Sequence, residues 1–150
     1  MNTKAIIEAV ATHALKTGWF ERVNQHEPKA GPPEGLTCAI WAQRLGPVPS
    51  GSGLASTTAR LEMNVRIYTN MLYEPADSID PRIVGAVDDL MGAYSGDFTL
   101  GATIRNVDLL GQAGPGLEAV AGYLTLDQRL YRVMTIHVPL IVNDAWTQAP

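Results

Sequence analysis

The stretch RLEMNVRIYTNML, residues 60–72, alternates between apolar and polar side chains. A period of two indicates a β-strand with one face toward a core and the other toward solvent or a partner. The stretch is about twice the usual strand length of roughly five to six residues, so we expect it to be central to the fold. The apolar face consists of Leu61, Met63, Val65, Ile67 and Met71. The opposite face consists of Arg60, Glu62, Asn64, Arg66, Tyr68 and Asn70.

A helix is predicted after this strand, because the sequence marks both its start and its end. Asp80 is a good N-cap, and Pro81 fits the first helical position, where its missing N–H costs nothing. Ile79 is expected to pack on Val84 as a hydrophobic staple, and Gly96 to end the helix. Its apolar face consists of Ile83, Val84, Val87, Leu90, Met91 and Tyr94.

A second helix is predicted at the N-terminus, capped by Thr3 and ended by Gly18. Its apolar stripe is Ile6, Ile7, Val10, Ala11 and Ala14. Strands are then predicted over residues 20–25 and 36–45.

Two segments between these elements predict extended loops. Residues 27–35 contain three prolines and two glycines, which cannot hold a ladder of strand hydrogen bonds. Residues 46–58, GPVPSGSGLASTT, form the longest weakly structured segment. Long loops of this kind are often functional, so this one is either a tolerant hairpin connection or an arm that orders on a partner.

The C-terminal third predicts further strands. Residues 99–110 read as a strand, 111–116 as a turn, and 117–126 with 130–142 as a β-hairpin. Pro139 suggests a sheet edge or a point where the last strand leaves the sheet, and 143–150 reads as a tail. This order of elements predicts one α+β domain over residues 1–150, with two main helices on a mostly antiparallel sheet.

Composition limits the classes of function. The net charge of −4 argues against a general nucleic-acid binder. The longest apolar runs are far short of the roughly 18 residues that a membrane span needs, and the N-terminus reads as an amphipathic helix rather than a signal peptide. The single cysteine, Cys38, has apolar neighbours and predicts a buried thiol, so a reducing cytoplasmic compartment is expected for assembly.

The sequence predicts no catalytic, cofactor-binding or metal-binding residues. His13, His26 and His137 lack the spacing of metal ligands, and the glycine-rich stretches lack the phosphate-loop pattern. The hypothesis is instead a protein interface on the polar face of the long strand and on the loop that precedes it, since arginine and tyrosine are enriched in interfaces. The candidate interface residues are Arg60, Glu62, Arg66, Tyr68, Ser50, Ser52 and Leu54.

Several phrases together resemble tail terminator proteins of long-tailed phages that infect actinobacteria. The phrases are FERVN (20–24), HEPK (26–29), GLT (35–37), AIWA (39–42), RIYTNML (66–72), IDP (79–81), YSGDF (94–98), RNVDLLG (105–111), YRVMTI (131–136) and PLIVND (139–144). They extend over nearly the whole chain, but none is a mechanistic motif.

The resemblance implies a structural virion protein with an α+β fold related to that of tail tube proteins. It implies a homohexameric ring on the head-proximal end of the tail tube, which stops tube polymerisation and contacts head-completion proteins. Genomic DNA would then pass through the lumen without sequence recognition. The alternatives are another tail or neck component, such as a tube or head-completion protein, and a small enzyme or ligand-binding domain.

Overall fold

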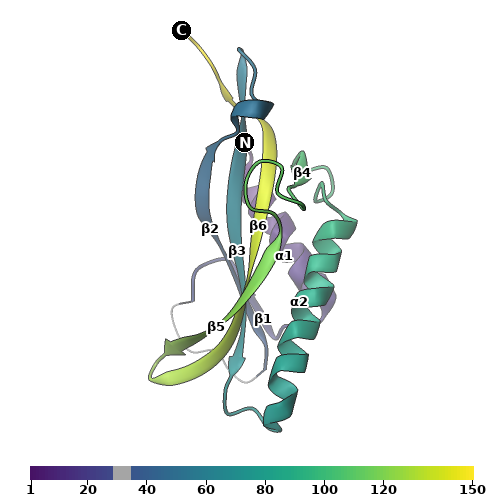
Figure 1. The fold of residues 1–150 in the computed structure, drawn as a ribbon, viewed down its shortest axis with the longest axis vertical. Coiled ribbons are helices and arrows are strands. Elements are labelled where there is room, and N and C mark those ends of the chain that lie inside the picture. Colours follow the sequence, from purple (N-terminus) through teal and green to yellow (C-terminus); the bar gives the residue numbers. More distant parts are fainter. Residues whose placement is uncertain (29–34) are drawn as a thin grey trace.

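The computed structural model describes residues 1–28 and 35–150 and confirms the α+β class. Within these residues, two helices pack on a six-stranded, mostly antiparallel sheet (Figure 1). The elements are α1 (Thr3–Thr17), β1 (Arg22–Asn24), β2 (Thr37–Pro47), η1 (Pro49–Gly51), β3 (Ser56–Asn70), η2 (Ala76–Ser78), α2 (Ile79–Gly96), β4 (Asn106–Val107), β5 (Glu118–Leu126) and β6 (Arg129–Thr147).

The strand predicted from the alternating stretch is the centre of the sheet. β3 pairs with β2 on one side and with β6 on the other, and β1 adds parallel to β2. The far side of β6 pairs with β5 over one part of its length and with β4 over another. The ends of β2, β3 and β6 near η1 and the C-terminus extend past both helices (Figure 1). At this end the sheet therefore continues beyond the helices, and Leu100, Ile104 and Val107 share its core cluster with Leu140 and Val142.

The apolar side chains at alternate positions of β3 pack against the helices, as predicted. Leu61, Met63, Val65 and Ile67 belong to one core cluster with residues of both helices. The helix residues that are buried in this core are Ile6, Val10, Ala11, Ala14, Ile83, Ala86, Val87, Leu90 and Tyr94. We call this the helix face of the sheet, and the opposite side the open face.

The open face is less exposed than the alternation suggested. Ala39, Tyr68, Tyr131 and Val133 form a second buried cluster there. The rings of Tyr68 and Tyr131 meet edge to face, with centroids 6.3 Å apart. Tyr131 comes from the distant β6, so the local pattern around Tyr68 carries no sign of this contact.

The ends of the helices differ in detail from the prediction. Asn2, not Thr3, caps α1, because its side chain accepts a hydrogen bond from the Ala5 N–H. Gly18 ends α1 in the left-handed conformation, as predicted.

The prediction for the start of α2 was wrong. The 3-10 turn η2 leads directly into the helix, so Ser78 is the N-cap and Asp80 lies in the first turn. No staple forms, because Ile79 is buried inside the helix while Val84 is 48% exposed.

The predicted strand over 99–110 is mostly wrong. Only Asn106–Val107 pairs with β6, and the residues before it form turns. Leu100, Gly101 and Ala102 have positive φ angles, which interrupt an extended chain.

The loop predicted over 46–58 is shorter than expected, since β2 continues to Pro47 and β3 begins at Ser56. Part of the predicted loop over 27–35 lies outside the described residues. The predicted C-terminal tail is also shorter, because β6 continues to Thr147.

The C-terminal hairpin forms as predicted, with Asp127 and Gln128 at positive φ in its turn. Pro139 lies inside β6, where the neighbouring strand changes from β5 to β4. The Pro139 carbonyl accepts from the Asp108 N–H, so the backbone nitrogen of Pro139 also faces the β4 side of β6 and not β3.

Candidate functional site

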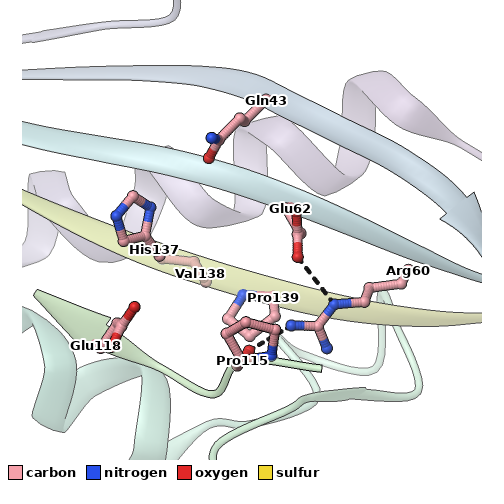
Figure 2. Close-up of a pocket in the computed structure, with 8 residues that line it drawn as sticks. All are labelled: Gln43, Arg60, Glu62, Pro115, Glu118, His137, Val138 and Pro139. Atoms are coloured by element: carbon pink, nitrogen blue, oxygen red, sulfur yellow. Dashed lines mark hydrogen bonds and ion pairs between the residues drawn. The ribbon is translucent and has the colours of Figure 1, made fainter. Parts of the chain in front are cut away.

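A small cleft with both polar and apolar lining lies on the open face where β2, β3, β5 and β6 come together (Figure 2). Its volume is about 190 Å³. The lining residues are Gln43, Arg60, Glu62, Pro115, Glu118, His137, Val138 and Pro139. Two of the predicted interface residues, Arg60 and Glu62, therefore belong to it.

Arg60 is held by three groups of its own chain. Its Nη1 donates to Asp108 Oδ2 at 2.6 Å and its Nε to Glu62 Oε1 at 3.1 Å. A third N–H donates to the Pro115 carbonyl. Figure 2 shows the guanidinium between Glu62 and Pro115. Arg60 thus fastens the turn after β4 to the open face instead of projecting toward a partner.

Asp108 is the other half of this buried ion pair. Its carboxylate also accepts from the backbone N–H groups of Gln112 and Ala113, at 2.8 and 2.9 Å. Burial alone raises the pKa of Asp108, but the two N–H donors and Arg60 outweigh it and hold the pKa below its ordinary value. The turn packs tightly here, since a Cβ on Gly114 would lie 2.9 Å from the Arg60 guanidinium.

Arg66 and Tyr68 also make contacts inside the chain. Arg66 donates to Thr135 Oγ1 at 2.9 Å, and its guanidinium lies 5.2 Å from the ring centroid of Trp41. Tyr68 is only 2% exposed, and burial raises its pKa. Arg66 keeps a partly exposed surface, whereas Arg60 and Tyr68 offer little surface to another protein.

The connection between β2 and β3 is ordered by hydrogen bonds within the chain. The Ser52 hydroxyl donates to the Val48 carbonyl and accepts from the Thr58 N–H. Thr58 in turn donates from its hydroxyl to the Gly51 carbonyl at 2.7 Å. Ser50 is exposed, and Leu54 is 98% exposed. These bonds shape the connection without a partner, and they leave the Leu54 side chain in solvent.

Cys38, His13 and His137 lie on three different elements, β2, α1 and β6. Cys38 is fully buried, and burial raises its pKa, which disfavours the reactive thiolate. His13 faces Asp97, and His137 faces Asn64 across the β3–β6 pair. Over residues 1–28 and 35–150, no group of three or more His, Cys, Asp and Glu side chains is placed to hold a metal ion.

Neither of the two helices in the described chain is long and apolar enough to cross a membrane. No protein-family model matches the chain, and no curated protein matches it.

Sequence reasoning missed Asp108, the most important partner of Arg60. The available signal was an acidic residue between Val107 and Leu109, just before a glycine-rich turn. Acidic side chains often accept hydrogen bonds from turn N–H groups, so this pattern could have predicted Asp108 as a buried residue of the turn. The sequence could not have predicted that Asp108 pairs with Arg60, which lies 48 positions away.

Proposed function

We propose that the chain is a structural virion protein, the terminator of a phage tail tube. In this role, six copies form a ring on the head-proximal end of the tube and stop its polymerisation. The ring then contacts a head-completion, or stopper, protein, and genomic DNA passes through its lumen without sequence-specific binding. Assembly takes place in the host cytoplasm, and the finished protein resides in the virion.

The observation that carries the proposal is the sheet that extends beyond its helical layer. The strands β3 and β6 continue past both helices at the end near η1 (Figure 1). β3 and β6 pair from Ser56↔Thr147 to Asn70↔Tyr131, with one register shift between Thr57 and Ala59. Such a sheet supplies extended edges and a projecting end for contacts with other copies.

Two further points support an assembly role. The sequence phrases given above resemble tail terminators over nearly the whole chain. On the open face, the cationic side chains of Arg60 and Arg66 are already engaged by groups of the same chain. Arg60 in particular is paired with the carboxylates of Glu62 and Asp108, which weakens its attraction for phosphate groups, and this suits a channel through which DNA slides.

The test is to purify the chain and measure its mass by light scattering, with negative-stain images of the same sample. We expect rings, and we expect added rings to stop the growth of purified tail tubes. A chain that stays monomeric and leaves tube growth unchanged would refute the proposal. Open-ended tubes formed by this chain alone would instead identify a tube protein.

A further inference from the structure

The sheet has two unpaired edges on its opposite sides. β5 pairs with β6 on its inner side, and no described strand pairs with its outer side. β1 covers the outer side of β2 only at Thr37–Ala39, so the outer side of residues 40–47 has no strand partner among the described residues, while their inner side pairs with β3.

The β5 edge lacks the features that usually protect an edge strand. Soluble proteins block strand addition with charged residues, prolines, bulges or short strands at such edges. β5 has nine residues, no proline, and a single charged residue, Glu118, at its start. Its apolar side chains include Val120 and Tyr123, which are more than half exposed. An edge of this composition is expected to be covered in the working protein.

The two edges are compatible in direction. β2, β3, β6 and β5 run antiparallel to one another in turn, so β5 and β2 have opposite directions. Rotation about an axis along the strands preserves the strand direction of each copy. The β2 edge of a neighbouring copy would therefore lie antiparallel to β5, as in the other main pairs of the sheet. This contact joins two different patches, which is the kind of interface that closes a ring.

The two edges are also complementary in charge. Arg44 is the single charged residue of residues 40–47, and Glu118 is the single one of β5. Arg44 lies opposite Glu62, and Glu118 lies opposite His137, so both side chains are on the open face. Both are exposed, and neither takes part in an ion pair among the described residues.

From these observations we infer that residues 118–122 of β5 in one copy add antiparallel to residues 40–44 of β2 in the next copy, with Glu118 beside Arg44. The occupant of each free edge is a second copy of this chain. The inference rests on the proposed function in requiring a ring of identical copies, and it names the surface that closes the ring.

The first experiment exchanges the two charges. Glu118→Arg and Arg44→Glu alone should each raise the protein concentration needed for half-assembly by roughly fivefold, because each replaces an exposed attraction by a repulsion. The double variant should restore most of the loss. Asp88→Lys, an exposed charge change on α2, is the matched control and should leave assembly unchanged. Circular dichroism checks that every variant is folded.

The second experiment tests the edge itself. Val120→Lys places a charge on the β5 edge without touching the core, and it should leave a folded monomer at concentrations where the original chain forms rings. In addition, Glu118→Cys and Arg44→Cys chains, mixed and oxidised, should give a disulfide-linked dimer, while each variant alone should not. Cys38 does not interfere because it is buried.

The outcomes separate this inference from the proposed function. Rings that form equally well with Val120→Lys, and that give no linked dimer in the mixture, overturn the edge pairing and leave the ring function standing. Two-fold dimers joined through two β5 strands also overturn it. An original chain that neither forms rings nor caps tubes overturns both.

Discussion

Asp108→Asn should destabilise the folded chain strongly, because it removes the charge that faces a buried guanidinium. The replaced carboxylate accepts from Arg60 and from two backbone N–H groups, and its side chain is 4% exposed. An amide of the same shape can accept some of these bonds, but its NH₂ group then faces other donors. Breaking a buried ion pair typically costs about 3–5 kcal/mol.

The expected loss lies at the lower end of that range, because Glu62 still pairs with Arg60 at 3.1 Å. We therefore expect the free energy of unfolding to fall by about 3 kcal/mol. With a urea m-value of about 2 kcal/mol/M, typical of small proteins, the midpoint moves down by about 1.5 M.

The assay is equilibrium urea unfolding at neutral pH, followed by circular dichroism and by tryptophan fluorescence. Asp88→Asn is the control, since it makes the same chemical change at an exposed position on α2, and it should shift the midpoint very little. If Asp108→Asn lowers stability by less than about 1 kcal/mol, the Arg60–Asp108 pair does not hold the turn in the way described.

Four further predictions follow from the same contacts. The pKa of Asp108 is held below the ordinary value of 3.8 in the folded chain, so its contribution should be complete above that pH and disappear as the pH falls through the lowered pKa; acid titration of the original chain should show this loss, and Asp108→Asn should not. Tyr94→Phe removes the buried hydroxyl that donates to the Val10 carbonyl at 3.0 Å, which should cost about 1–3 kcal/mol in urea unfolding. Arg66→Ala should cost about 1–2 kcal/mol by the same assay, through the lost hydrogen bond and the lost contact with Trp41. An unchanged midpoint would show that neither contact adds stability. Leu54→Ser should change the melting temperature by no more than about 2 °C, because the leucine is almost fully exposed, and a larger drop would mean that it packs.

The alternation of residues 60–72 predicted the helix face of the sheet correctly, because burial on one side imposes a period of two. The same pattern could not predict the open face. Tyr68 is buried by Tyr131 and Val133, and Arg60 is neutralised by Asp108, all from segments far along the chain. Polar residues at alternate positions show that one face of the strand tolerates polar groups. They do not show whether those groups contact water or other groups of the chain.

The local sequence signals did not distinguish between neighbouring candidate positions at the helix starts. Asn2 and Thr3 are both capping residues in adjacent positions, and the observed geometry selects Asn2. Asp80 and Pro81 also fit a helix start, but the turn at Ala76–Ser78 begins the helix earlier and buries Ile79.

The composition of the residues before β4 predicted a strand, but positive φ angles at Leu100 and Ala102 interrupt the extended backbone. Such angles in residues other than glycine depend on the surrounding packing, so composition gives no warning of them.

The long ladder between β3 and β6 also has a mechanical consequence. Its hydrogen bonds lie perpendicular to the strands, from Ser56↔Thr147 at one end to Asn70↔Tyr131 at the other. A tensile force along the strands therefore loads the uninterrupted run from Ala59↔Val142 to Asn70↔Tyr131 in shear, so that its bonds share the load. A force across the strands would peel them apart one after another. The domain is consequently strongest along its own long axis, the direction in which β3 and β6 extend past the helices (Figure 1).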